Sequence, residues 1–302
     1  MIEPALGVRF SVVIATKDRS EFLGRALDSL VLQCDAPSFE VIVADNGSTD
    51  ETAALVENRR AAGTPFKLTR LFVPEPNRGK ARNAGIDAAR GEIILFIDDD
   101  VWLPAGFLAA HSAAHDGANM CVNGPIINVP SYEDRPKPTT LNYSAAFLCT
   151  CNASISREAL ADACGFDERF NLYGWEDTDL GLRLRRAGVR RSFAWDAYLY
   201  HIKPPAADTL EVVLQKTMEK ARMAVRLLEK DSGVRARLAT GAYGLNFLRA
   251  RLFAPERLMP MYAGIAQDKR FSNVLRGLAR GRLLDGAYAN ELRRALRTRM
   301  SQ

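Results

Sequence analysis

The sequence predicts an α/β domain, with a mostly parallel, twisted sheet flanked by helices, followed by a C-terminal helical appendage. Three observations carry this prediction. Strand-like and helix-like segments alternate four times in the first hundred residues, polar clusters follow three of the strands, and the last third of the chain has helical periodicity. A chain of 302 residues accommodates either one large domain with an appendage or two domains.

The elements of the first half follow from runs of β-branched residues and from apolar residues at helical spacing. Strands are expected at 10–15, 40–44, 68–73 and 92–97. Helices are expected at 21–33 and at 80–89. A further helix is expected to start at the capping residues 49–52 and to end at residue 58. Polar clusters follow three of the strands, at 16–19, 45–48 and 98–100. Ligands of parallel sheets bind beyond the carboxyl ends of the strands, so these clusters mark the expected site.

A second block of elements is expected between the acidic cluster and Pro204. Gly124 to Leu141 is rich in proline and polar residues and predicts a long loop, and Phe147 to Ile155 is strand-like. A helix is expected after the loop at 165–173, with Gly188 as its stop. The alternation of apolar residues from Phe193 to His201 predicts one further strand.

Charge is distributed unevenly along the chain. Residues 207–302 carry 19 lysines and arginines against 9 acidic residues, a net charge of +10, whereas residues 1–206 carry 22 against 27, a net charge of −5. Basic amphipathic helices are expected from Thr209 onward. Two interpretations of these helices are equally consistent with the sequence. They could contact an anionic membrane peripherally, or they could form a helical subdomain that packs on the core or mediates a homodimer.

Several classes of protein are disfavoured by what the sequence lacks. It has no zinc-finger spacing and no basic run interleaved with aromatic residues, so nucleic acid is not an expected partner. Residues 1–9 lack the features of a signal peptide, and no apolar run approaches membrane-spanning length. Five cysteines without a secretion signal predict reduced thiols and a cytoplasmic protein, soluble or peripheral at the inner face of the membrane.

Two small groups of residues are expected to be structural. Cys149 and Cys151 share one face of the predicted strand, but no second ligand pair accompanies them, so a zinc site is not expected. His111 and His115 are expected at the surface.

The acidic cluster Asp98, Asp99 and Asp100 is the first candidate for chemistry. Three carboxylates at one strand end repel each other, so a fold that holds them together must supply a cation or strong donors. Carboxylates with phosphate oxygens suit Mg²⁺ or Mn²⁺. The alternative is a solvated turn, because aspartate is common after strands. The neighbouring polar clusters favour the metal site.

Four segments in order resemble the successive motifs of family 2 glycosyltransferases. They are FSVVIATKDR at 10–19, EVIVADNGSTD at 40–50, NRGKARNAG at 77–85 and GEIILFIDDD at 91–100. The resemblance covers residues 8 to 203 and implies the GT-A fold, a GT-A domain at 1–206 and a basic helical region at 207–302. Within the domain it implies a nucleotide-binding half at 1–104 and an acceptor-binding half at 105–206.

The resemblance assigns roles to residues of the first half. Thr16 and Arg19 correspond to the donor pocket at the first strand end, Asp45 to the acid that pairs with uracil, and Arg82 to a basic residue near the nucleotide. In the acidic cluster, Asp98 corresponds to the acid that faces the ribose, Asp99 to the variable donor-side position, and Asp100 to the metal ligand. The sequence departs from the family at Ala15, where proline is common, and at Asn46, where a second aspartate is common.

The segment GWEDTDLG at 174–181 is similar to the Gly-Trp-Glu-Asp motif of galactosyltransferase-like and chondroitin-polymerase-like domains. The resemblance makes Asp177 the general base and Glu176 a catalytic residue that also binds the acceptor. The alternative is that these acids only stabilise a helix N-terminus. Trp175 is expected to stack on the acceptor sugar rather than only pack in the core, and His201 is expected as a further metal ligand.

These assignments predict an inverting glycosyltransferase. It would use a nucleotide-sugar donor, expected to be UDP-linked, with Mn²⁺ or Mg²⁺, and a hydroxyl of a glycan or lipid-linked acceptor. A nucleotidyltransferase acting on sugar phosphates is the first alternative, although residues 16–20 lack the glycine of its usual first loop. A noncatalytic sugar-binding domain of the same fold is the second alternative.

Overall fold

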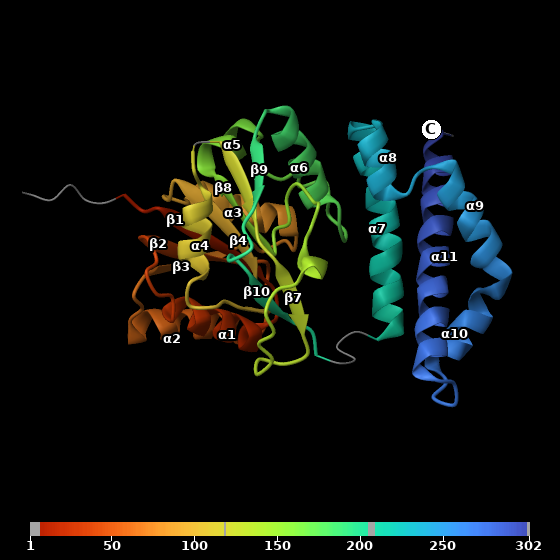
Figure 1. Cartoon of the computed structure of the whole chain (residues 1–302), viewed down its shortest axis with the longest axis horizontal. Coiled ribbons are helices and arrows are strands. Elements are labelled where there is room, and N and C mark those ends of the chain that lie inside the picture. The colour runs from red at the N-terminus through yellow and green to blue at the C-terminus, as the bar shows by residue number, and fades with distance from the viewer. Residues whose placement is uncertain (1–6, 118, 205–208, 301–302) are drawn as a thin grey trace, which may run out of the picture. The chain divides into compact units, whose positions relative to one another are not determined.

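The computed structural model describes residues 7–117, 119–204 and 209–300, and the chain forms two compact units (Figure 1). Unit 1 comprises Met1–Asn171 and Glu176–Ala207, and unit 2 comprises Leu172–Trp175 and Asp208–Gln302. The predicted boundary at 206/207 lies outside the described residues, as do residues 1–6 of the segment considered for a signal peptide.

Unit 1 is built on a seven-stranded sheet with the order β3-β2-β1-β4-β8-β6-β9. Its first half is parallel and consists of β1 (Phe10–Thr16), β2 (Phe39–Asp45), β3 (Lys67–Phe72) and β4 (Ile93–Asp98). Its second half consists of β6 (Met120–Asn123), β8 (Asn152–Ser156) and β9 (Arg190–Phe193). Strand β8 runs antiparallel to β4 and β6, so the sheet is mostly but not wholly parallel.

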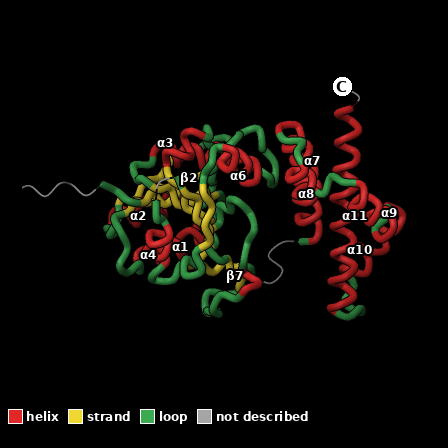
Figure 2. The backbone as a smooth tube through the Cα atoms, turned by 45° about the horizontal axis from the view of Figure 1, so that its top comes forward, coloured by secondary structure: helices red, strands yellow, loops and turns green. Residues whose placement is uncertain are grey.

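The helices of unit 1 cover both faces of this sheet (Figure 2). Apolar side chains of α1 (Ser20–Val31), α2 (Thr52–Ala62) and α4 (Phe107–Ala114) join one core cluster with β1, β2 and β4. Those of α3 (Arg78–Ala88), α5 (Arg157–Asp162) and α6 (Glu176–Arg186) join the cluster on the opposite face. The predicted fold class, α/β with helices flanking a mostly parallel sheet, is confirmed.

A second, three-stranded sheet has the order β5-β10-β7. It consists of β5 (Val101–Trp102), β7 (Ile126–Val129) and β10 (Leu199–Ile202). Strand β7 lies within the segment 124–141 that was predicted to be a long loop. The rest of that segment is irregular, except where the 3₁₀ turn η1 (Thr140–Asn142) begins. Burial of Ile127 and Val129 against Tyr200 and Ile202 stabilises this strand despite the surrounding prolines.

Two other predicted strands differ from the structure. Residues 147–151 precede β8 as loop and turn, so the strand begins only at Asn152. The alternating run from Phe193 to His201 is not one strand, because a turn at Trp195 and Asp196 separates β9 in the large sheet from β10 in the small one. Aspartate favours turns, and alternation of apolar residues alone does not reveal such a break.

The expectation that His111 and His115 lie at the surface is wrong for His111 of α4, and His115, which follows the helix, is only partly exposed. His111 is fully buried, with its ring nitrogens 2.8 Å from Ser154 Oγ and 2.9 Å from Asn152 Oδ1, and burial lowers its pKa to about 4. His115 is half-buried, its Nε2 lies 2.7 Å from the same Ser154 Oγ, and burial likewise lowers its pKa to about 4. Both are therefore neutral at pH 7 and link α4 to β8.

Unit 2 is helical, as predicted. Its elements are α7 (Leu210–Lys230), α8 (Val234–Thr240), α9 (Gly244–Phe253), the 3₁₀ turn η2 (Glu256–Leu258), α10 (Met259–Gln267) and α11 (Asn273–Met300). Helices α7 and α11 lie side by side (Figure 1), and Ala221, Ala224, Val225 and Leu292 form the centre of their shared core. No helix in the described part of the chain has the length and apolar character needed to cross a membrane.

Candidate active site

Three polar residues meet where β1, β2 and β4 end. In the parallel register, Thr16 lies opposite Asp45, and Ala15 lies opposite Asp98. The chain then turns through Asp99 and Asp100 before β5. The sheet therefore brings residues from three distant segments to one edge, as the sequence predicts.

Asp99 is held by partners from the loop after β1. Its Oδ2 accepts a hydrogen bond of 2.7 Å from Thr16 Oγ1, and its Oδ1 accepts one of 2.9 Å from Arg19 Nη1. Burial raises the pKa of Asp99 to about 6, although Arg19 and Thr16 favour the charged form. Its position between two other carboxylates adds to this rise.

Asp100 is buried among cationic groups. Its Oδ2 accepts from Arg19 Nη2 at 3.0 Å and from Lys203 Nζ at 3.3 Å. Its Oδ1 lies 3.0 Å from His201 Nε2 and is buried without a hydrogen bond from the described residues. Burial alone would raise the pKa of Asp100, but His201, Arg19 and Lys203 together hold it well below its usual range.

His201 is oriented by β7. Its Nδ1 lies 3.1 Å from Asn128 Oδ1, and because an amide oxygen only accepts, Nδ1 must carry the proton. This contact directs Nε2 toward the acidic cluster, 3.0 Å from Asp100 Oδ1. Fixing the far ring nitrogen in this way is common for histidines that bind metals.

The donor atoms around His201 fit a divalent metal. One ligand atom each from Asp98, Cys151 and His201 lies within 4.8 Å of the others, and Asp100 Oδ1 is buried without a hydrogen bond. Carboxylate oxygens with one imidazole suit Mn²⁺ or Mg²⁺. Cys151 was expected to be structural, and burial raises the pKa of its thiol well above its usual range, so the neutral thiol is the stable form.

Arg82 joins the strand-end cluster to α6. It lies in α3, which packs so closely on β1 that a Cβ on Gly85 would lie 2.5 Å from Val13. Its guanidinium is buried and lies 3.2 Å from Glu176 Oε1 and 3.7 Å from both Asp98 Oδ1 and Asp177 Oδ1. The sequence predicts contact of Arg82 with the nucleotide, whereas in the structure it also pairs with Glu176 and Asp177 of α6.

Asp177 stands in the first turn of α6 and is fixed from one side. Its Oδ2 accepts hydrogen bonds from Thr150, 3.1 Å from the backbone nitrogen and 2.9 Å from Oγ1. Its Oδ1 has no hydrogen-bond partner among the described residues. Burial raises the pKa of Asp177 to about 6 against the attraction of Arg82, and the carboxylate of Glu176 adds to the rise. A pKa of about 6 leaves Asp177 mostly ionised at pH 7, with one buried oxygen that accepts no hydrogen bond from the described residues and lies 3.7 Å from Arg82 Nη1.

Asp45, predicted to pair with uracil, is fully buried and already hydrogen-bonded. Its Oδ1 accepts from Ser48 N at 2.8 Å, and its Oδ2 accepts from Arg70 Nε at 2.9 Å. Arg70 comes from β3 and was not a candidate from the sequence. A base bound here would meet an aspartate–arginine pair rather than a free carboxylate.

Trp175 packs within unit 2. Its Nε1 donates a hydrogen bond of 2.7 Å to the carbonyl of Lys220, and Lys220 Nζ lies 5.1 Å from the ring centroid. The backbone of Trp175 has a φ of +75°, a conformation that costs energy for a residue other than glycine. These contacts give Trp175 the packing role considered as the alternative, and its contact with the acceptor stays a prediction.

Comparison with known proteins identifies the family. The model described as "Glycosyl transferase family 2" matches residues 11–164, which is half of the chain and contains the strand-end cluster. The chain belongs to glycosyl transferase family 2. A second model, described as "N-terminal domain of galactosyltransferase", matches residues 136–204, which contain Glu176, Asp177 and His201.

Curated relatives agree with this assignment. The uncharacterized glycosyltransferase YfnE of Bacillus subtilis is 28% identical over 66% of this chain and 66% of its own length. The validoxylamine A glucosyltransferase of Streptomyces hygroscopicus subsp. limoneus is 26% identical over 72% of this chain and 56% of its own length. The chain therefore spans less than two thirds of the length of these curated relatives.

Solved structures share the fold. The mannosyltransferase PcManGT from Pyrobaculum calidifontis, in complex with GDP-Man and Mn²⁺, is 18% identical with a TM-score of 0.66, covering 96% of this chain and 88% of that one. TarS 1–349 of S. aureus, in complex with UDP-GlcNAc, is 21% identical with a TM-score of 0.55, covering 98% and 93%. These similarities place unit 1 among GT-A glycosyltransferase folds.

Four residues of this family 2 site were not predicted to act there. Thr150 holds Asp177, Lys203 pairs with Asp100, Arg70 pairs with Asp45, and Cys151 lies beside Asp98 and His201. Two of them had a signal in the sequence, Lys203 as a cation two residues after His201 and Cys151 as a thiol considered for a zinc site. The other two lie in segments whose approach to the site depends on the tertiary fold.

Proposed function

We propose that the chain transfers a sugar from a nucleotide-sugar donor to a hydroxyl of a glycan or lipid-linked acceptor. Its family membership supports this, and the observation that carries the proposal is the geometry of Asp177. This carboxylate is held through one oxygen by Thr150, has a pKa of about 6, and leaves its other oxygen without a hydrogen-bond partner in the described chain. A general base requires these properties.

The donor is proposed to be UDP-linked and to lie along the edge formed by β1, β2 and β4. Its base would lie between Thr16 and Asp45, and Asp98 would accept from the ribose. Arg19 and Arg82 would face the diphosphate and Asp99 would keep Arg19 in position, because Arg19 bridges Asp99 and Asp100. Arginine suits this task since its planar fork matches phosphate oxygens.

Asp100 and His201 are proposed to hold Mn²⁺ or Mg²⁺, next to Asp98 and Cys151. Such an ion, when bound, neutralises the negative charge that develops on a departing diphosphate. Asp100 Oδ1 and His201 Nε2 are the two atoms in position for this, 3.0 Å apart. Arg19 and Lys203, which pair with Asp100 Oδ2, also offer positive charge to the diphosphate.

Asp177 is proposed to remove the proton from the acceptor hydroxyl as its oxygen attacks C1 of the donor sugar. The C1–oxygen bond to the diphosphate breaks, the nucleoside diphosphate leaves with the bonding electrons, and the proton stays on Asp177. Attack from the face opposite the leaving group inverts C1, so an α-linked donor yields a β-linkage. Glu176 and Trp175 are proposed to bind the acceptor.

The direct test is to incubate the chain with UDP- and GDP-sugars, Mn²⁺ and candidate glycan acceptors. We expect metal-dependent release of the nucleoside diphosphate and a product with inverted anomeric configuration by NMR. Asp177→Asn should abolish transfer, and Asp87→Asn, at an exposed position of α3, is the matched control. Reaction of a sugar phosphate with a nucleoside triphosphate would instead indicate a nucleotidyltransferase. Sugar binding without turnover would indicate a noncatalytic domain.

A further inference from the structure

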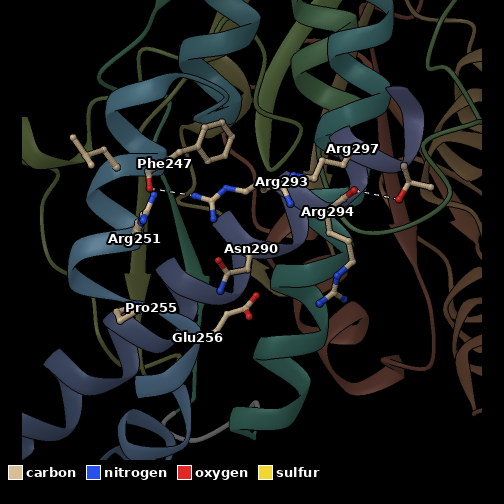
Figure 3. Close-up of a pocket in the computed structure, with 10 residues that line it drawn as sticks. Phe247, Arg251, Pro255, Glu256, Asn290, Arg293, Arg294 and Arg297 are labelled. Atoms are coloured by element: carbon tan, nitrogen blue, oxygen red, sulfur yellow. Dashed lines mark hydrogen bonds between the residues drawn. The ribbon is translucent and has the colours of Figure 1, made fainter. Parts of the chain in front are cut away.

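Unit 2 contains a cavity of about 770 Å³ between α9, η2 and α11 (Figure 3). Its lining is dominated by four arginines, Arg251 from α9 and Arg293, Arg294 and Arg297 from α11. Glu256 is the one acidic residue among the lining residues. All residues that line the cavity belong to unit 2.

Part of this positive charge is not paired with an acidic side chain among the residues that the structure describes. Arg293 extends from α11 toward α9 and donates a hydrogen bond of 3.2 Å to the carbonyl oxygen of Phe247 (Figure 3). Its guanidinium carbon lies 5.2 Å from the centroid of the Phe247 ring. These contacts hold the side chain in place but do not neutralise the charge of the guanidinium. Arg294 pairs with Glu291 Oε2 at 3.2 Å, but Glu291 is shared with Arg222. Within the described residues, Arg251 has no ion pair and no side-chain hydrogen bond.

An arrangement of this kind favours a phosphate group. Guanidinium groups around one cavity repel each other, and a bound anion removes that repulsion. Arginine also binds phosphate oxygens with two parallel hydrogen bonds, which a single lysine does not do.

Exposed leucines of α9 include one that lines the cavity. Leu248 lines the cavity and is 51% exposed, and Leu245 and Leu252 on the same side of α9 are 74% and 63% exposed. Their spacing of three and four residues forms a continuous apolar stripe. A stripe of leucines beside a cluster of arginines is typical of helices that lie in the interface of an anionic bilayer.

We propose that Arg251, Arg293, Arg294 and Arg297 bind phosphate head groups of anionic phospholipids, with Leu245, Leu248 and Leu252 entering the interface beside them. The occupant is a bilayer surface rather than a second copy of the chain, because a copy would bring the same positive charge to the cavity. The proposal does not depend on the proposed glycosyl transfer, and its test does not measure transfer.

The test measures sedimentation of the full chain with vesicles of phosphatidylcholine alone and of phosphatidylcholine mixed with phosphatidylglycerol. We expect binding only to the mixed vesicles, and release when NaCl is raised from about 0.05 M to about 0.5 M. Arg251→Gln/Arg297→Gln should weaken binding about 30-fold. The matched control is Arg235→Gln/Arg280→Gln, which removes the same charge at exposed positions outside the cavity and should weaken binding less than about 3-fold.

Four outcomes would overturn the proposal. Equal losses in the two double variants would mean that net charge alone, and not the cavity, binds the vesicles. Saturable binding of inorganic pyrophosphate by calorimetry without vesicle binding would identify a site for a free phosphate compound. A dimer of the wild-type chain that Leu245→Ser/Leu248→Ser/Leu252→Ser dissociates, again without vesicle binding, would assign the leucine stripe to a second copy. Absence of salt-sensitive binding to the mixed vesicles by the wild-type chain would overturn the proposal even where a variant does not fold.

Discussion

The two units use charged residues in opposite ways. In unit 1, Arg82 and Asp100 are buried and each is surrounded by groups of opposite charge. In unit 2, most arginines are exposed, and residues 207–302 have a net charge of +10. A buried charge is fixed in position and expensive to leave unpaired, whereas an exposed charge acts at a distance and contributes little locally. Substitutions in the two units should therefore differ in size and in kind.

The largest effect is expected from Asp177→Asn, which removes the proposed base but keeps the shape of the side chain. The transfer rate should fall by about 10²- to 10⁴-fold, since an amide does not accept the acceptor proton. Donor binding measured by calorimetry should be unchanged, because Arg82 keeps its contacts with Asp98 and Glu176 in this variant. Transfer at the wild-type rate would assign the base to another residue.

Arg82→Met should be the most destabilising change in unit 1. It leaves Asp98, Glu176 and Asp177 without their shared cation, and loss of one partner of a buried ion pair costs about 3–5 kcal/mol. Urea unfolding gives the free energy of unfolding directly. A loss below about 1 kcal/mol would mean that water already screens these carboxylates as it does at the surface.

Asp99→Asn should instead stabilise the protein at pH 7.5. Folding raises the pKa of Asp99 from 3.8 to about 6, so the folded protein binds a proton at this carboxyl more tightly than the unfolded chain does. The stability that this proton contributes is therefore lost as pH rises through about 6. The shift corresponds to at most about 3 kcal/mol at pH 7.5. The gain should vanish below about pH 3.8, where the carboxyl is protonated in both states. Thermal unfolding across pH measures this, and destabilisation at pH 7.5 would contradict it.

The transfer rate should also depend on pH through Asp177. Burial raises the pKa of this carboxyl to about 6, and only its ionised form accepts a proton. The rate should be constant above about pH 7 and fall to roughly a tenth at pH 5, as pH drops below the pKa. A rate that stays constant down to pH 5 would mean that this carboxyl is not the base.

Part of this organisation is readable in the sequence. Parallel strands that each end in polar residues must bring those residues to one edge, so the meeting of Thr16, Asp45 and Asp98 follows from the strand pattern. The helical unit follows from the periodicity after Thr209 in the same way. Both depend on local patterns that repeat over many residues.

Other features depend on contacts between segments with no shared pattern. Nothing in the residues around Thr150 or Arg70 indicates that they hold Asp177 and Asp45, because the tertiary fold brings them there. His111 is buried because Ser154 and Asn152 of β8 satisfy its ring nitrogens, and the sequence of α4 alone does not reveal those partners. The break between β9 and β10 likewise follows from the two sheets they join.

The smallest effect is expected in unit 2, from Arg249→Gln. Arg249 Nη2 lies 3.3 Å from Asp285 Oδ2, with the two side chains 55% and 45% exposed, so water screens the pair and its loss should cost less than about 0.5 kcal/mol. Glu291→Gln in the same unit provides the contrast, because Glu291 is buried and accepts from Arg222 at 2.6 Å. That change should cost about 1–3 kcal/mol in urea unfolding. If the two variants lose equal stability, burial does not explain the difference between the units, and the net charge of each unit becomes the better explanation.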